Sequence, residues 1–284
     1  MAELVVSLQE NGEACFEGSQ ARVFLRADGS AMRKLKRPSA YTAMKTAVQL
    51  LHISQHPNMV RIFSMESGDL CMEAMHVSLQ QHLPPGQTFF FHVKLHIALA
   101  VAHGLHHLHT NSMDHGDLCP SNILLAWTHG EMLVKLCDFY NERTGTSRTA
   151  AYAAPEVVRS PPATMFPADI WAFACCLLFL EGVEPFHGFE EDQAKFFYLG
   201  LHQCVAFRED GVFKQFSLLH CAYAPARHIG QTLWADILAG AFVPEASRLT
   251  SQQLLGQLAA LRAPPVPAKQ AQMHRVPFKC INSK

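Results

Sequence analysis

Two carboxylates and an amide within one short stretch have the clearest chemical potential in this chain. Asp117 precedes Asn122 by five residues, and Asp138 follows Asn122 by sixteen. A carboxylate can accept the proton of a reacting hydroxyl group. Carboxylate and amide oxygens are also the ligands that hard divalent cations prefer. The three residues are therefore a candidate site for chemistry at a hydroxyl group beside a metal ion.

The sequence around these residues resembles the protein kinase superfamily. Residues 115–122, H-G-D-L-C-P-S-N, and residues 138–140, D-F-Y, are similar to the family's catalytic loop and its D-F-G turn. Four other family patterns occur in the family's order: G-L-x-x-L-H at 104–109, T-x-x-Y-x-A-P-E at 149–156, D-x-W-x-F at 169–173 and R-x-T-x-x-x-L-L at 248–255. Pro120 favours the serine/threonine class over the tyrosine class.

The resemblance implies transfer of the γ-phosphate of ATP to protein hydroxyl groups, with Mg²⁺ as the metal. The acid at the position of Asp117 lies beside the acceptor hydroxyl in the family, and the residues at Asn122 and Asp138 hold the metal. We therefore take Asp117, Asn122 and Asp138 as the candidate catalytic residues. Asn122 and Asp138 are also the candidate metal ligands.

The resemblance also assigns structural roles in the second half of the chain. In the family, the residues at the positions of Glu156 and Arg248 form a buried ion pair. The acid at the position of Asp169 holds the backbone of the catalytic loop by hydrogen bonds. We expect both features here.

Candidate nucleotide ligands lie earlier in the chain. Residues 17–24 resemble the Gly-rich loop, although Gly18 is the only one of its glycines that remains, and Val23 takes the place of its valine. Met72 stands at the gatekeeper position of the family. Glu73 and Met75 stand at hinge positions whose backbone groups bind adenine in the family.

The ion pair that orients the phosphates of ATP in the family is missing here. Arg33 stands where the strand lysine belongs, and its neighbour Lys34 would point to the opposite face of a strand. Both are candidate nucleotide ligands. Ala47 stands where the partner glutamate belongs, and residues 29–65 contain no Asp or Glu. We therefore expect weak or altered nucleotide binding.

A further departure concerns regulation. Gly116 replaces the arginine that receives a phosphorylated activation loop in the family. We therefore do not expect phosphorylation of that loop to switch this protein in the usual way.

Three functions compete on these grounds. The candidate catalytic trio favours a serine/threonine protein kinase with atypical nucleotide anchoring. Ala21, Arg33, Ala47 and Gly116 favour the alternative of a pseudokinase, which would use the fold as a binding or scaffold module. A small-molecule kinase is the third alternative, because such enzymes also carry H-G-D-x-x-x-x-N. Residues 152–156 and the helix start at 169–171 count against it, because in the family those elements belong to a platform for protein substrates.

Hydrophobic patterning predicts an α+β fold with a β-rich part followed by a helical part, and the resemblance implies that these are the two lobes of a protein kinase. The small lobe is β-rich, with strands within 13–36, 59–65 and 70–75 and one helix at 39–54. The larger lobe is mainly α-helical, with helices that include 92–110 and 168–180. The predicted boundaries are an N-terminal extension at 1–12, the small lobe at 13–75, the large lobe at 76–262 and a Pro-rich, disordered tail at 263–284.

Composition limits the partners and the compartment. The 23 basic and 24 acidic residues provide no field that would attract nucleic acid or an anionic membrane. The nine cysteines include no C-x-x-C pair, and the start resembles no signal peptide, so an intracellular location, cytoplasmic or nuclear, is expected. The expected partner is a protein substrate, and the oligomeric state stays open. A short activation segment would suit a large DNA virus, whose kinase would act in the host cell.

Overall fold

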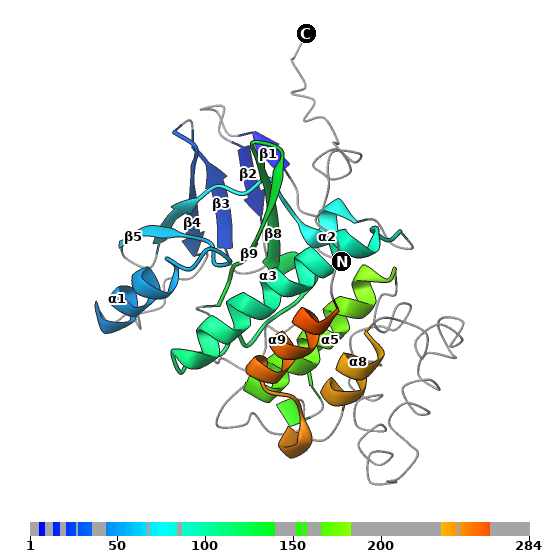
Figure 1. Ribbon diagram of the computed structural model, residues 1–284. Helices are drawn as coiled ribbons and strands as arrows, with labels where there is room; N and C mark the ends of the chain where they lie inside the picture. The colour runs from blue at the N-terminus through cyan, green and yellow to red at the C-terminus, as the bar shows by residue number, and fades with distance from the viewer. Residues whose placement is uncertain are drawn as a thin grey trace.

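The computed structural model describes residues 6–8, 14–17, 21–26, 28–35, 44–66, 69–83, 87–139, 152–154, 156–157, 166–182, 234–242 and 245–261. The two parts differ in secondary structure, with a β-sheet above and a group of helices below it (Figure 1). This arrangement confirms the predicted α+β fold with a β-rich lobe and a helical lobe.

The small lobe is an antiparallel six-stranded sheet with the order β1-β2-β3-β4-β6-β5. Its strands are β1 (Val6–Leu8), β2 (Ala14–Glu17), β3 (Ala21–Leu25), β4 (Ser30–Leu35), β5 (Ile62–Glu66) and β6 (Asp69–Glu73). The turn before β4 uses Gly29 at φ +80°, and Asp28 accepts hydrogen bonds from the backbone and hydroxyl of Ser30. β1 lies in the stretch that we predicted as an extension, and it pairs with β2.

Helix α1 (Met44–Ile53) is the helix that we predicted at 39–54, and it lies beside β5 at one edge of the sheet (Figure 1). Its buried side includes Leu50 and Ile53. The segment after it, residues 54–60, contacts a part of the chain outside the small lobe. In this segment Val60 donates a hydrogen bond to the carbonyl of Leu136 at 2.9 Å.

A three-stranded sheet, β7-β8-β9, forms the border between the two lobes. Its strands are β7 (Val77–Ser78), β8 (Ile123–Thr128) and β9 (Glu131–Leu136). β8 and β9 pair along their whole length, so the residues before β8 and after β9 lie side by side. This pairing brings the two predicted catalytic stretches together.

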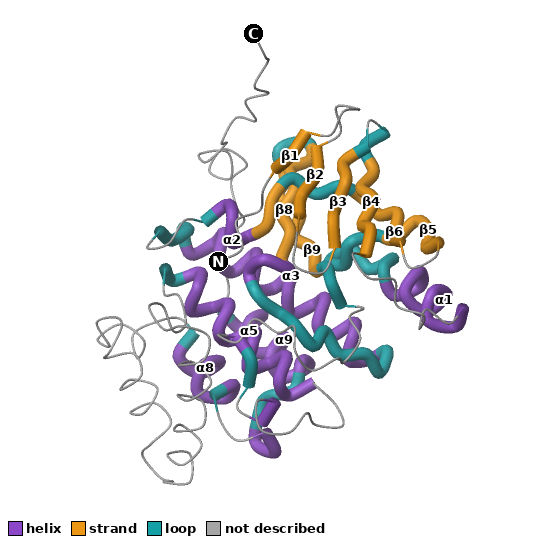
Figure 2. Tube along the Cα trace, turned by 180° about the vertical axis from the view of Figure 1, so that it is seen from behind, coloured by secondary structure: helices purple, strands orange, loops and turns teal. Residues whose placement is uncertain are grey.

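The large lobe is built around two helices, α3 (Phe91–Thr110) and α5 (Phe166–Leu180), with smaller elements around them (Figure 2). These are α2 (Leu79–His82), α8 (Ala235–Ala241), α9 (Ser251–Ala260) and the short 3₁₀ turns η1 (Pro120–Asn122) and η4 (Glu245–Ser247). Every residue of α5 from Ala168 onward is buried, as expected for a helix that is apolar on all sides. None of the helices in the described ranges has both the length and the apolar character that crossing a bilayer requires.

Candidate active site

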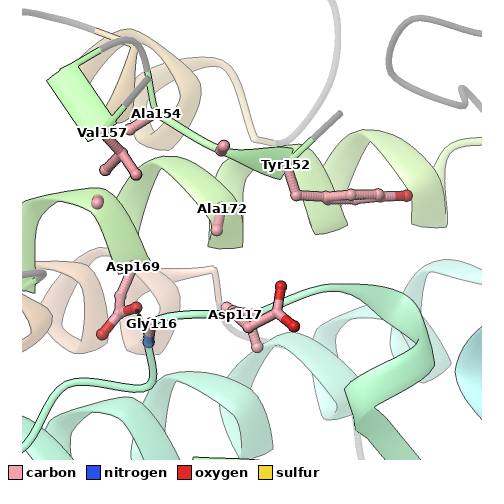
Figure 3. Close-up of a pocket in the computed structure, with 10 residues that line it drawn as sticks. Gly116, Asp117, Tyr152, Ala154, Val157, Asp169 and Ala172 are labelled. Carbon is pink, nitrogen blue, oxygen red and sulfur yellow. Dashed lines mark hydrogen bonds between the residues drawn. The ribbon is translucent and has the colours of Figure 1, made fainter. Parts of the chain in front are cut away.

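The catalytic loop follows α3 and is held by a single carboxylate. Asp169, in the first turn of α5, accepts hydrogen bonds from the backbone N–H of His115 at 2.8 Å and of Gly116 at 2.9 Å. Nε2 of His109 contacts the same carboxylate at 3.0 Å. Figure 3 shows Asp169 reaching the Gly116 backbone. The expected role of Asp169 is confirmed.

Gly116 has a backbone conformation that side chains disfavour. Its φ is +75°, in the left-handed region where a Cβ atom normally crowds the following carbonyl. The glycine that replaces the family's arginine therefore adopts this turn without that penalty.

His115 lies beneath the loop as a neutral imidazole. Its Nδ1 accepts a hydrogen bond from the backbone N–H of Asp117 at 3.4 Å, so the proton resides on Nε2. Burial lowers the pKa of His115 from its ordinary value of 6.5, against the opposing effect of Asp169 and Asp138. We therefore expect the carboxylate of Asp117, rather than the buried imidazole, to act on an acceptor hydroxyl.

The structure brings the predicted catalytic residues together at the ends of β8 and β9. Asn122 donates a hydrogen bond from Nδ2 to the backbone carbonyl of Asp117 at 2.8 Å. The carbonyl of Asn122 accepts a hydrogen bond from the N–H of Cys137, the residue before Asp138, at 3.0 Å. The three side chains thus come from two turns that hydrogen bonds join directly.

The donor set of this site suits a hard divalent cation. The Nδ2 atom of Asn122 is used by the Asp117 backbone, which leaves its carbonyl oxygen as the ligand atom. Asp138 supplies a carboxylate, and its side chain is 29% exposed. Oxygen donors of these two kinds are the ligands that Mg²⁺ takes from proteins.

Asp138 also contacts a cation of the small lobe. Nε of Arg33, on β4, lies 3.3 Å from Oδ1 of Asp138, and the arginine side chain is 6% exposed. Asp138 has φ +60°, which aspartate tolerates better than most residues do. Phe139, the next residue, is buried. The position of the family's lysine is therefore filled by a buried arginine that is paired with the D-F-G aspartate.

Lys34 lies away from this contact. Neighbouring residues of a strand point to opposite faces, and Lys34 is exposed with its Nζ 5.6 Å from the centre of the Phe24 ring. Val23 pairs directly with Arg33 and therefore shares its face. Of the two predicted cations, the structure brings only Arg33 to Asp138.

The predicted hinge joins β6 to β7. Met72 is buried on β6 and pairs with Ala31 of β4. Oε1 of Glu73 contacts Nζ of Lys135 on β9 at 2.5 Å, and it accepts a hydrogen bond from the N–H of Arg61 at 2.7 Å. The Glu73 side chain therefore links β6 to β9 and to the residue just before β5.

The remaining predicted positions have less structural detail. Met75 is partly buried just after β6. Gly18, the expected remnant of the Gly-rich loop, lies outside the described residues. Position 47 falls within α1, whose first turn contains no acidic residue.

A shallow hollow that opens to solvent lies beside the Asp117 carboxylate. In Figure 3 the carboxylate points toward this space, and the ring of Tyr152 lies on the other side. Its remaining walls are mostly small or apolar side chains, from Leu118, Ala153, Ala154, Val157, Ala168 and Ala172. A group that enters the hollow therefore meets an acid on one side and an apolar wall on the other.

The expected ion pair between Glu156 and Arg248 is confirmed. Nη2 of Arg248 contacts Oε2 of Glu156 at 3.2 Å, and Nη1 contacts Oε1 as well. Nη1 also donates a hydrogen bond to the carbonyl of Pro167 at 2.9 Å. The arginine side chain is 1% exposed, so this pair fixes the segment beside the hollow to the start of α5.

Sequence reasoning missed two contacts between segments that are distant in the chain. The pair of Lys135 with Glu73 had no signal in the motifs. The imidazole rings of His56 and His107 stack with centroids 4.5 Å apart. The only signal for the stack was the high histidine content, which does not specify a partner.

The two-lobed fold, together with Asp117, Asn122 and Asp138 at the border of the lobes, defines the class of protein kinases. A family model described as the protein kinase domain matches residues 25–255, and the chain belongs to the protein kinase family.

Relatives agree with this assignment. The chain is 29% identical over 168 residues to a probable serine/threonine-protein kinase of Dictyostelium discoideum, covering 51% of this chain and 12% of the relative. It is also 29% identical over 168 residues to the probable serine/threonine-protein kinase mkcC of the same organism, covering 55% and 19%. A death-associated protein kinase related protein of Drosophila melanogaster is 34% identical over 127 residues, covering 42% and 18%. The aligned part is less than one fifth of the length of each of these relatives.

Proposed function

We propose that this protein is a serine/threonine protein kinase that transfers the γ-phosphate of ATP to protein hydroxyl groups. The observation that carries the proposal is that hydrogen bonds join the turns of Asp117, Asn122 and Asp138, while Asp117 also lines a hollow on its other side. An acceptor hydroxyl in the hollow would lie next to the Asp117 carboxylate.

In this mechanism Asp117 orients the acceptor hydroxyl and accepts its proton as the oxygen attacks the γ-phosphate, whose bond to ADP breaks so that ADP leaves. Asn122 and Asp138 would hold Mg²⁺, which supplies neutralisation of the phosphate charge. The hydrogen bond from Asn122 to the Asp117 backbone couples the position of the metal ligand to that of the base. The Asp169 carboxylate keeps the loop in place by binding two consecutive backbone N–H groups.

A protein acceptor is favoured by the wall opposite Asp117. The segment at Tyr152, which forms this wall, matches the family's platform for protein substrates. A small-molecule kinase would not need this segment. The serine/threonine names of the relatives also support a protein hydroxyl as acceptor.

A second candidate is a pseudokinase, which binds partners through the same fold without phosphate transfer. The observation that favours it is the Arg33 contact with Asp138, because this cation lies on a carboxylate that the metal needs. In addition, α1 contains no acidic residue.

We also propose a reducing, intracellular compartment, either cytoplasmic or nuclear. Cys175 and Cys176 are adjacent buried thiols without a disulfide. Burial raises the pKa of both thiols, which keeps them protonated and unreactive.

The test measures the transfer of label from labelled ATP, in the presence of Mg²⁺, to a mixture of candidate protein acceptors. We expect label to reach protein serine or threonine, and we expect Asp117→Ala and Asp138→Ala each to reduce the rate by about 100-fold or more. Asp236→Ala, an exposed acid on α8, is the matched control and should retain the wild-type rate. No transfer by the wild type, with nucleotide bound, would favour the pseudokinase. Transfer to small alcohols or amines alone would favour the third alternative.

A further inference from the structure

Arg33, the cation at the position of the family's strand lysine, lacks the glutamate that usually orients that lysine. Residues 29–65, which include all of α1, contain no Asp or Glu. No movement of α1 can therefore bring a carboxylate of its own to Arg33. Arg33 instead contacts the carboxylate of Asp138, 105 positions later in the chain and in the other lobe.

The contact between these two residues has the features of a built site. Arg33 lies on β4 in the middle of the sheet, and Val23 and Leu70 flank it on the neighbouring strands. A guanidinium that is 6% exposed needs a charged or strongly polar partner, because burial of an unpaired charge is costly. Asp138 meets this need from a left-handed conformation, with φ +60°.

We propose that Arg33 and Asp138 together form the phosphate anchor of the nucleotide site, with Asp138 serving as the acid that α1 lacks. The proposal rests on the nucleotide binding of the proposed function, and it does not require phosphate transfer. Asp138 then has two roles, as a metal ligand and as the group that orients Arg33.

The chemistry of arginine makes such an anchor possible. A guanidinium has five N–H donors in a planar fork, so one side chain can contact a carboxylate and phosphate oxygens at the same time. A lysine ammonium is a point charge without this fixed geometry. The anchor therefore predicts that Arg33→Lys is not a conservative change.

Because Asp138 would serve both as a metal ligand and as the partner of Arg33, its effect on ATP affinity should differ with and without metal. A carboxylate that serves only as a metal ligand repels phosphate when metal is absent, so its removal should leave nucleotide affinity unchanged or improved. A carboxylate that orients the phosphate-binding arginine helps nucleotide binding even without metal. The effect of Asp138→Asn in a metal-free buffer therefore separates the two roles.

The experiment is calorimetric titration of the full chain with ATP, in EDTA and again in Mg²⁺. The variants are Arg33→Leu, Arg33→Lys and Asp138→Asn. Arg61→Leu removes an exposed arginine of the same lobe, whose side chain lies over Phe63, and is the matched control. Titration with adenosine, which has no phosphate, reports whether each variant retains a folded nucleotide pocket.

In EDTA we expect Arg33→Leu and Asp138→Asn each to weaken ATP binding by about 10-fold or more, with a smaller loss for Arg33→Lys. Adenosine binding and the Arg61→Leu variant should stay at wild-type values. ATP binding in EDTA that is unchanged or tighter in Asp138→Asn would overturn the anchor, as would unchanged binding in Arg33→Leu. Absence of nucleotide binding by the wild type would overturn both proposals. If the variants change ATP binding as expected but the wild type transfers no phosphate, only the proposed function would be overturned.

Discussion

At the scale of single residues, two turns of the site use left-handed backbone conformations. Gly116 has φ +75° and Asp138 has φ +60°, and both lie at the ends of hydrogen-bonded loops. The sequence identifies both positions through motifs, but a motif does not specify a dihedral angle. In the folded protein Asp169 binds the backbone N–H of Gly116, and Arg33 contacts the side chain of Asp138.

Replacement of Gly116 tests this conformation. We expect Gly116→Val to reduce the free energy of unfolding by about 1–2 kcal/mol, and Gly116→Asn to reduce it less, because asparagine tolerates positive φ. Space is not the reason, because the nearest atom to an added Cβ is Oδ1 of Asp114 at 3.5 Å. Urea unfolding of the three proteins measures the difference. Equal losses in the two variants would contradict the role of φ.

At the scale of elements, the placement of β9 explains how Asp138 reaches the site. Asn58 brackets this strand, with a hydrogen bond from its Nδ2 to the carbonyl of Val134 at 3.1 Å. Its own carbonyl accepts a hydrogen bond from the N–H of Leu136 at 2.9 Å. Gly104 of α3 also approaches Leu136, so closely that an added Cβ would lie 2.8 Å from a methyl group. Helix, strand and loop thus position the residues just before Asp138.

Gly104→Ala should disturb this packing. An alanine gains helix propensity of up to about 1 kcal/mol, but overpacking against the fully buried Leu136 costs about 1–3 kcal/mol, so we expect a net loss of stability. Gly256→Ala on α9 is the matched control, because no atom lies within 4 Å of its added Cβ and it should stabilise the protein. Thermal unfolding of both variants gives the comparison. An increase in melting temperature for Gly104→Ala would show that the close approach is not limiting.

At the scale of the whole molecule, a histidine stack lies where the segment after α1 meets α3. His56 stacks on His107, whose Nε2 donates a hydrogen bond to the carbonyl of Ile53 at 3.1 Å. The Nδ1 atom of His56 accepts a hydrogen bond from the backbone of Asn58 at 3.1 Å, which requires a neutral ring. Burial, together with the nearby His107, His103 and His106, lowers the pKa of His56 to about 4.

The stack predicts a dependence of stability on pH. In the unfolded chain His56 binds a proton below its ordinary pKa of 6.5, whereas in the folded protein it does so only near 4. The unfolded state therefore binds more protons between these values, and stability should fall as the pH is lowered from about 6.5 to about 4. His56→Phe keeps an aromatic ring without the titration, so its unfolding midpoint should depend less steeply on pH in this window. Equal slopes for the two proteins would exclude His56 as the cause.

The sequence alone determined the family, the order of the lobes and the three candidate catalytic residues, Asp117, Asn122 and Asp138. Motifs survive as local patterns, and apolar periodicity predicted α3 and α5 to within two residues at each end. It also determined that no acid in residues 29–65 could pair with Arg33. The tertiary structure alone decided which acid replaces it, because Arg33 and Asp138 meet only after the two lobes pack together. The same holds for the pairs of Glu73 with Lys135 and of His56 with His107, since a contact between distant segments depends on packing that local patterns do not record.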